Sequence, residues 1–256
     1  MGDDHSLRAQ EIDTLRHGID LGLTLIDTAE MYGDGAAEEL VGEAIQGRRD
    51  QVFLVSKVYP HNASKHKMQA SCNESLRRLR VEAIDLYLLH WPGAVPLAET
   101  VAAFEDLQRQ GKIRHWGVSN LDLDYMKSLL SVPGGAAAQT DQLLYNLARR
   151  GIEWDLLPWL RTHRMPVMAY SPIEQGRLLR KAGLPAFAKR LDMTPAQVSI
   201  AWLLAQEGVI AIPKTANRQR LEQNAAALDH PLTPEQLREL DALFPPPSGP
   251  MPLEML

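Results

Sequence analysis

Seven short, nearly continuous apolar segments recur along the chain and predict buried strands. Val, Ile and Leu dominate these segments, and polar residues do not alternate with them. That pattern is typical of strands that are covered on both faces of a parallel sheet. The segments are Thr24–Asp27, Val52–Lys57, Ile84–His90, Ile113–Asn120, Thr140–Tyr145, Pro166–Ser171 and Val209–Lys214.

Helical patterns separate these segments, because apolar residues recur between them at three- and four-residue spacing. Two later helices are expected to begin after Thr194 and Thr233. Each threonine is followed by a proline and, three positions on, by a glutamine, which is an N-terminal capping pattern. The other predicted helices cover Leu7–Leu21, Ala36–Gln46, Lys67–Leu79, Leu97–Gln110 and Leu121–Leu130.

Strand and helix alternate at intervals of about 30 residues, which is the length of a repeated βα unit. Strict alternation favours parallel strands. We therefore predict one α/β domain over residues 1–256, a parallel (β/α)8 barrel of the TIM type. The alternative is an open doubly wound sheet, but no strand is followed by a complete G-x-G-x-x-G motif.

The predicted barrel lacks one strand, because such a barrel has eight and seven are visible. The first helical pattern begins almost directly after Met1. We expect the first strand to be missing, through a gene start assigned too late or through natural shortening. Thr24–Asp27 and Val209–Lys214 would then border an open seam, and exposed strand edges of this kind favour association with another chain.

Composition narrows the function classes. Of the 256 residues, 45% are hydrophobic and 23% are charged, which are ordinary values for a globular protein. The net charge of −5 argues against nucleic-acid binding. With Cys72 as the only cysteine, an intrachain disulfide and a thiolate metal cluster are excluded. No apolar run approaches the roughly 18 residues of a membrane span, and no signal peptide is visible, so we expect a cytoplasmic protein without a membrane partner.

Polar residues end three consecutive predicted strands, and the carboxyl ends of barrel strands carry the chemistry. These residues are Asp27, Lys57 and His90, and Tyr32 follows Asp27 by five positions. A lysine ammonium beside a tyrosine favours loss of the phenolic proton, and Asp27 can hold Lys57 in place. A neutral His90 can offer an N–H to a carbonyl oxygen. Together the four residues suit protonation of an oxygen that becomes an alkoxide.

Each of these residues alone could equally be a helix cap or a loop contact, and only their convergence argues for chemistry. His61, His66 and Cys72 lie close together, but their spacing fits no common zinc pattern, so we expect no metal. Tyr59 and Trp91 flank the four residues. They are candidates for a substrate pocket, although a packing role fits them as well.

The set Asp27, Tyr32, Lys57 and His90 resembles the catalytic tetrad of the aldo-keto reductases. Three further segments resemble signature segments of that family, and the similarity is greatest to bacterial members that act on small aldehydes, including methylglyoxal reductases. These segments are Gly22–Gly33, Gly111–Asn120 and Ile212–Thr215, the last followed by Arg220 and Asn224.

The resemblance implies NADPH-dependent reduction of small aldehydes or ketones, with Tyr32 as the proton donor and the nicotinamide stacked on Tyr170. Gln223 departs from the family pattern, since many relatives have Glu there, which leaves the adenine contact open. The cofactor contacts that the resemblance implies are Ser119, Asn120, Gln142, Tyr170, Ser171, Lys214, Thr215, Arg220 and Asn224.

The missing strand keeps a second function class open: a cofactor-binding or regulatory protein on a truncated reductase scaffold, with little turnover. A weaker third interpretation is a hydrolase or lyase on an open α/β sheet, which an absence of NADPH binding would favour. We expect a monomer, and open strand edges would be the place where it could associate.

Some side chains are interpreted as structural. The arginine pairs Arg77–Arg78 and Arg149–Arg150 are expected to be solvated surface. Cys72 lies inside a helical pattern and is expected to be an inert, small hydrophobic residue. Core or helix packing is expected for Trp116, Trp154, Trp159 and Trp202.

Overall fold

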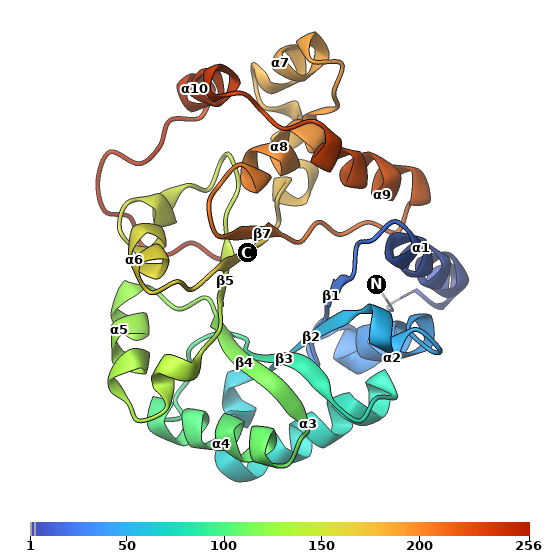
Figure 1. The fold of residues 1–256 in the computed structure, drawn as a ribbon, viewed down its shortest axis with the longest axis vertical. Coiled ribbons are helices and arrows are strands. Elements are labelled where there is room, and N and C mark those ends of the chain that lie inside the picture. The colour runs from blue at the N-terminus through green and yellow to red at the C-terminus, as the bar shows by residue number, and fades with distance from the viewer. Residues whose placement is uncertain (1, 3) are drawn as a thin grey trace. The chain divides into compact units, whose positions relative to one another are not determined.

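The computed structural model describes residues 2 and 4–256 (Figure 1). The chain divides into two compact units. The first unit comprises Met1–Thr140 and Ala216–Arg218, and the second comprises Asp141–Thr215 and Gln219–Leu256. The expectation that the whole chain forms one barrel domain stays a prediction.

Four parallel strands in sequence order form the sheet of the first unit. Register pairs Asp27 with Val55, and Lys57 with Leu88. The strands are β1 (Leu25–Asp27), β2 (Phe53–Val58), β3 (Ile84–Leu89) and β4 (Ile113–Ser119).

Three parallel strands, again in sequence order, form the sheet of the second unit. They are β5 (Asp141–Leu144), β6 (Val167–Tyr170) and β7 (Val209–Ala211). Among the residues that the structure describes, the prediction of seven strands is confirmed. However, β7 ends three residues earlier than expected. Ile212 still donates its N–H to the Ala169 carbonyl at 3.1 Å, but Pro213 has no N–H with which to continue the ladder.

Helices follow the strands, as predicted. Both capping boxes are present, with Thr194 bonded to Gln197 and Thr233 bonded to Gln236. In the first unit the helices are α1 (Arg8–Asp20), α2 (Ala36–Ala44), α3 (Lys65–Leu79), α4 (Leu97–Arg109) and α5 (Leu123–Ser131). Those of the second unit are α6 (Leu156–Thr162), α7 (Leu184–Arg190), α8 (Pro195–Leu204) and α10 (Pro234–Leu243), while α9 (Arg218–Ala225) begins in the first unit and continues in the second.

Three of these helices were not predicted. α6 and α7 span seven residues each, which is too short to show a helical period. α9 has no buried residue and so presents no apolar face that a sequence pattern could reveal.

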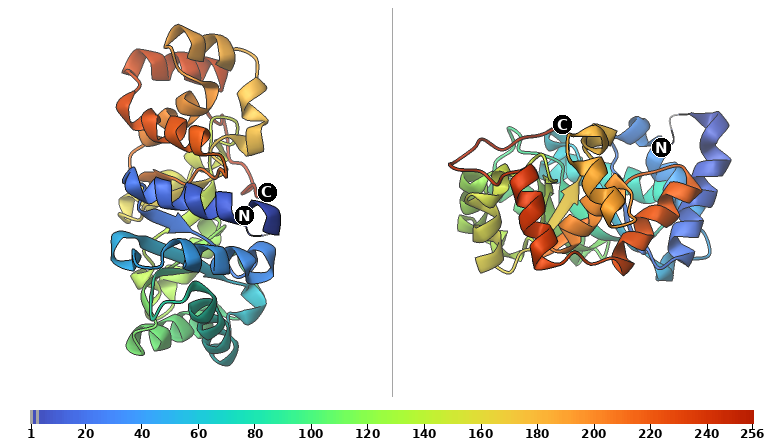
Figure 2. Two further views of the ribbon diagram at one scale, coloured as in Figure 1. Left: turned by 90° about the vertical axis from the view of Figure 1, so that its right-hand side faces the viewer. Right: turned by 90° about the horizontal axis from the view of Figure 1, so that it is seen from above.

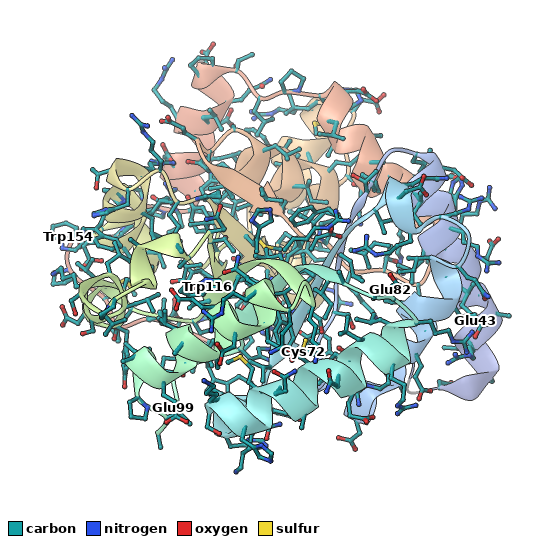
Figure 3. All side chains as sticks on the ribbon, turned by 60° about the horizontal axis from the view of Figure 1, so that its bottom comes forward. Glu43, Cys72, Glu82, Glu99, Trp116 and Trp154 are labelled. Carbon is teal, nitrogen blue, oxygen red and sulfur yellow. The ribbon has the colours of Figure 1, made fainter. Side chains whose placement is uncertain are left out.

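Helices α2–α5 lie along the outside of the sheet of the first unit (Figure 1). The buried residues of the sheet and of these helices form the core of this unit. Trp116 of β4 stacks on Phe104 of α4 with the ring centroids 5.0 Å apart, and Tyr87 of β3 meets Phe104 edge-on. Cys72 of α3 is fully buried, and burial raises the pKa of its thiol to about 12 (Figure 3). The expectation of a core Trp116 is therefore confirmed, and the burial of Cys72 fits the expected small hydrophobic residue, while its inertness stays a prediction.

α1 packs against α2 in the same unit (Figure 2). Ile12 of α1 contacts Leu40 and Ala44 of α2 in a small apolar cluster. An ion pair between Arg8 and Glu43 at 2.9 Å closes one end of this contact. Among the described residues, no helix combines the length and apolar character that crossing a membrane requires.

The tryptophans of the second unit differ from one another. Trp202 is buried and tilts against Tyr145, with ring centroids 5.2 Å apart. Trp154, labelled in Figure 3, is 47% exposed, so its expected packing role is wrong. It follows the short 3-10 turn Gly151–Glu153 rather than lying on the inner face of a helix, and the turn directs it to solvent.

The arginine pairs are not simply solvated surface, and that expectation is wrong for three of the four residues. Arg78 pairs with the fully buried Glu38 at 2.6 Å. Arg150 is only 10% exposed and pairs with Glu153 and Asp241. Arg149 binds the buried Glu174, as described below. Arg77 is the one that remains exposed. The carboxylates that bind these arginines are mostly distant in sequence, so no local pattern indicates them.

Candidate active site

The four tetrad residues predicted from the sequence all lie in the first unit and converge. Asp27 is the last residue of β1, Lys57 lies on β2, and His90 follows β3 directly. The His90 N–H bonds to the Val58 carbonyl at 3.0 Å, so this residue extends the sheet by one position.

The loop after β1 brings Tyr32 back over β2. Thr28 donates its N–H to the Val55 carbonyl at 2.9 Å, and Glu30 donates its N–H to the Lys57 carbonyl at 3.4 Å. The loop therefore follows β2 beyond the end of β1. A turn, closed by a hydrogen bond from the Tyr32 N–H to the Ala29 carbonyl, then starts the 3-10 segment Tyr32–Gly35.

Lys57 is the centre of the arrangement and is fully buried. Its Nζ donates to Asp27 Oδ2 at 2.6 Å, to the Thr28 carbonyl at 2.9 Å and to the Tyr32 hydroxyl oxygen at 3.3 Å. These acceptors match the three N–H groups of an ammonium. Burial alone would lower the pKa of Lys57, but the negative charge of Asp27 and the hydrogen bonds to Asp27 and Tyr32 outweigh it and raise that pKa. Lys57 is therefore charged at neutral pH.

His90 faces Tyr32 as a neutral imidazole. The two rings meet edge-on with centroids 5.7 Å apart. Burial, with a contribution from the Lys57 charge, lowers the pKa of His90 to about 3. Its Nδ1 is buried and has no hydrogen-bond partner among the residues that the structure describes.

The tetrad can therefore protonate an oxygen on which negative charge develops. A phenol hydrogen-bonded to a buried ammonium is a general acid whose conjugate base is stabilised, and a neutral imidazole can act as an electrophile. Within the described part of the chain, no three His, Cys, Asp or Glu side chains are grouped closely enough to hold a metal ion.

Three aromatic rings continue from His90 and form what we call the aromatic wall: Tyr59, His61 and Trp91. Trp91 lies 4.8 Å from His90, centroid to centroid, and meets Tyr59 edge-on at 5.8 Å. His61 stacks on Tyr59 at 4.8 Å. Tyr59 and Trp91 are half-buried, so both expected pocket residues lie beside the tetrad. The sequence marks His61 only as a candidate metal ligand, because no sequence pattern indicates that its ring stacks on Tyr59.

The first unit also carries two of the expected cofactor residues. Ser119 ends β4 and is almost fully buried, and Asn120 follows it with a φ of +59°. The Asn120 amide donates to the His90 carbonyl and to the Ser119 hydroxyl oxygen, each at 3.1 Å. A hydroxyl and an amide next to the tetrad have the donor and acceptor groups that a carboxamide requires.

The second unit carries the other expected cofactor residues. Gln142 lies buried on β5, and Tyr170 is the half-buried last residue of β6. Ser171 follows with a φ of +51°, and its carbonyl accepts a hydrogen bond from the Asn146 amide at 2.9 Å.

The remaining expected contacts lie later in the chain. Lys214 and Thr215 lie beyond the end of β7, and Arg220 and Asn224 lie on α9. Lys214 and Arg220 are exposed cations, which is the chemistry that a phosphate requires.

A buried glutamate that the sequence did not indicate holds the loop after β6. Glu174 accepts hydrogen bonds from the Asn146 amide at 2.9 Å and from Arg149 at 2.8 and 2.9 Å. Arg177 adds a bond at 3.1 Å, and Arg149 also binds Glu254 near the C-terminus. Glu30 in the loop after β1 was missed in the same way.

Comparison with known proteins identifies the family of the chain. Residues 2–244 match the aldo/keto reductase family. The chain is 52% identical over 261 residues to the methylglyoxal reductase YeaE of Escherichia coli, covering 100% of this chain and 92% of the relative. It is 33% identical over 248 residues to a glyoxal reductase of Bacillus subtilis, covering 95% and 87%.

Solved structures show the same fold. The crystal structure of an aldo/keto reductase from Klebsiella pneumoniae in complex with NADP and acetate matches with a TM-score of 0.98 at 52% identity. The match covers 100% of this chain and 92% of that one. The prediction of a (β/α)8-type barrel fold with seven strands is confirmed by this match and by the seven strands among the described residues. The chain belongs to the aldo/keto reductase family.

Proposed function

We propose that the chain reduces small aldehydes and ketones with NADPH, and that 2-oxoaldehydes such as methylglyoxal are among its substrates. As a member of the aldo/keto reductase family, it is an NADPH-dependent oxidoreductase. The observation that carries the finer proposal is the contact of the buried, charged Lys57 with the Tyr32 hydroxyl at 3.3 Å. The names of the Escherichia coli and Bacillus subtilis relatives support methylglyoxal and glyoxal as substrates.

The donor sets fit the two ends of the cofactor. The polar groups of Ser119, Asn120 and Gln142 would hold the nicotinamide carboxamide, and the ring of Tyr170 would stack on the nicotinamide. NADPH, when bound, supplies the hydride for the carbonyl carbon. Ser171, Lys214, Thr215 and Arg220 would hold phosphate groups, the last three at the 2′-phosphate, and Asn224 would contact the adenine.

Tyr32 delivers the proton in this mechanism. Its hydroxyl donates to the carbonyl oxygen as negative charge develops there. Lys57 stabilises the phenolate that remains, and Asp27 holds the ammonium of Lys57 in place at 2.6 Å. The neutral imidazole of His90 offers an N–H to the same oxygen and so orients the carbonyl group. Tyr59 and Trp91 line the substrate side.

A second candidate is a cofactor-binding or regulatory protein with little turnover. The observation that favours it is that the end strand of each unit is short or exposed. β1 has only three residues and ends the sheet of the first unit, while Ile210 of β7, the end strand in the second unit, is 39% exposed. Such edges can also pair with another chain. We propose that the protein is nevertheless a monomer in the cytoplasm, and light scattering tests the monomer.

The two candidates separate in one experiment. NADPH binding is followed by fluorescence titration, and NADPH consumption is followed by absorbance with methylglyoxal, glyoxal and simple ketones. We expect binding and turnover together, fastest with the dicarbonyl compounds. Binding without turnover of any carbonyl compound favours the second candidate. An absence of NADPH binding contradicts both and favours a hydrolase or lyase.

A further inference from the structure

Glu30 is a buried carboxylate between two tetrad residues, in the loop that joins Asp27 to Tyr32. It is 9% exposed. One carboxylate oxygen accepts the Tyr59 N–H at 2.6 Å and the Asn62 side-chain amide at 3.3 Å. The other oxygen accepts the hydroxyl of Ser71.

These hydrogen bonds join three separate parts of the first unit. Glu30 belongs to the loop after β1, Tyr59 and Asn62 to the segment after β2, and Ser71 to α3. The three donors are uncharged. Hydrogen bonds to a carboxylate are short and directional, so the side chain fixes positions rather than merely neutralising a charge.

The contacts around Glu30 form a closed circuit. Tyr32 meets His90, His90 meets Trp91, and Trp91 meets Tyr59 through the ring contacts described above. Tyr59 is then bonded through its N–H to Glu30, two residues before Tyr32. The circuit therefore begins and ends in the loop after β1. Three of its contacts are between rings, and the fourth is the hydrogen bond to the carboxylate of Glu30.

We propose that Glu30 is a positioning residue that fixes the aromatic wall relative to Tyr32, and so determines how well the enzyme reduces aromatic and other bulky aldehydes. The proposal rests on the proposed function, because it takes Tyr32 as the proton donor and Tyr59 as a pocket residue. A carbonyl compound that is small enough to avoid the wall requires only the tetrad. A larger one must also fit between Tyr32 and the wall.

The tetrad does not depend on the Glu30 side chain for its own geometry. Lys57 bonds directly to Asp27 and Tyr32, and the contact of Glu30 with Lys57 runs through the Glu30 backbone. Loss of the side-chain contacts of Glu30 with Tyr59 and Ser71 should therefore disturb the wall and leave the proton transfer intact. A merely structural role would instead lower the rates with all substrates in parallel.

Two variants distinguish the effect of the length of the Glu30 side chain from the effect of its charge. Glu30→Gln keeps the length of the side chain and an oxygen for the Tyr59 N–H, but removes the charge. Glu30→Asp keeps the charge, but is one methylene too short to reach Tyr59 and Ser71 together. Glu39, exposed on α2, provides matched controls as Glu39→Gln and Glu39→Asp.

The readout is kcat/KM with NADPH for phenylglyoxal relative to methylglyoxal. We expect Glu30→Asp to lower this ratio by about 10-fold or more, since a displacement of roughly 1 Å can cost 10²-fold in rate. Glu30→Gln should stay within about threefold of the wild-type ratio, and the pH profile with methylglyoxal should be unchanged in both. A ratio in Glu30→Asp equal to that in Glu39→Asp overturns the proposal. So does an equal loss in Glu30→Gln and Glu30→Asp.

A second measurement does not depend on activity. Hydrogen exchange at the Tyr59 amide should be faster in Glu30→Asp than in Glu39→Asp, and close to wild type in Glu30→Gln. If wild-type protein reduces no carbonyl compound, the proposed function fails, and amide exchange alone decides whether Glu30 holds the wall. Equal exchange in the two aspartate variants overturns that positioning role.

Discussion

The loops after β1 and β6 are each fixed by a buried glutamate, but by different kinds of interaction. In the first unit, Glu30 accepts hydrogen bonds from a backbone N–H, an amide and a hydroxyl. In the second unit, Glu174 accepts them from two guanidinium groups and an amide. One loop carries the proposed proton donor, and the other follows the proposed nicotinamide contact Tyr170.

The charged partners of Glu174 lie at the loop whose backbone is strained. Burial would raise the pKa of Glu174, but hydrogen bonds from Arg149, Asn146 and Arg177 outweigh it and lower that pKa. The backbone here is strained, because Ser171, Glu174 and Gln175 all have φ between 51° and 53°. Such residues cost of order 1–3 kcal/mol each, so charged interactions offset a cost at this loop.

The largest expected effect on the rate comes from removing the buried ammonium of Lys57 in the first unit. Lys57→Met should lower kcat by about 10²- to 10⁴-fold, because the proposed proton donor Tyr32 loses the ammonium that stabilises its phenolate. Steady-state measurement of kcat with methylglyoxal, in Lys57→Met and in the wild type, gives the size of this loss. Lys65→Met, at an exposed lysine of α3, is the control and should keep wild-type kcat. A Lys57 variant with normal kcat would remove the ammonium from the mechanism.

A smaller effect is expected at the phosphate contacts. Charge-assisted hydrogen bonds contribute roughly 1.5–3 kcal/mol each, so Arg220→Ala should weaken NADPH binding by about 10- to 150-fold. NADH binding should barely change. Fluorescence titration of both cofactors checks this, with Arg238→Ala on α10 as the exposed control. Equal losses for the two cofactors contradict a 2′-phosphate contact.

The two glutamates should differ in their contribution to stability. Glu174→Gln should lower the free energy of unfolding by about 1–3 kcal/mol, allowing for the partial exposure of Arg149 and Arg177. Glu30→Gln should cost less than about 1 kcal/mol, since its donors are neutral and an acceptor oxygen remains. Denaturant unfolding of both variants tests the comparison, and equal losses would show that the guanidinium groups add nothing.

The pH dependence of stability sharpens the same comparison. A carboxyl with a lowered pKa in the folded state stabilises the protein above its unfolded pKa, and this stabilisation is lost as the pH falls through the folded value. The difference between wild type and Glu174→Gln should therefore be full at neutral pH and shrink below the ordinary glutamate value of 4.5. A difference that stays constant into acid would exclude Glu174 as an ionised group.

The smallest expected effect concerns His90. With its pKa near 3, the imidazole stays neutral and should give no inflection in kcat/KM between about pH 5 and 8. A pH–rate profile with methylglyoxal measures this directly. An inflection near pH 6.5 that disappears in His90→Gln would contradict a neutral imidazole.

The sequence predicts those parts of the molecule that depend on local patterns. The seven strands, the capping boxes at Thr194 and Thr233, and the convergence of Asp27, Lys57 and His90 follow from periodicity and from the rule for strand ends. The sequence predicts that Tyr32 lies near Lys57, but not the distance between them, because that distance depends on how the loop follows β2.

Interactions between residues far apart in sequence could not be predicted. Glu174 binds Arg149 across 25 positions, and Arg149 binds Glu254 across 105. Glu30 reaches Ser71 across 41 positions. The glutamates and Arg149 look like ordinary surface charges in the sequence, and only the folded chain brings their partners within hydrogen-bond distance.

The central claim is that Tyr32 delivers the proton while the cofactor contacts lie elsewhere. Tyr32→Phe removes one hydroxyl and leaves the ring that faces His90. Single-turnover reduction of methylglyoxal and NADPH titration on the same preparation test the claim together. We predict a rate lower by about 10²- to 10⁴-fold with an unchanged Kd for NADPH. An unchanged rate would contradict the claim.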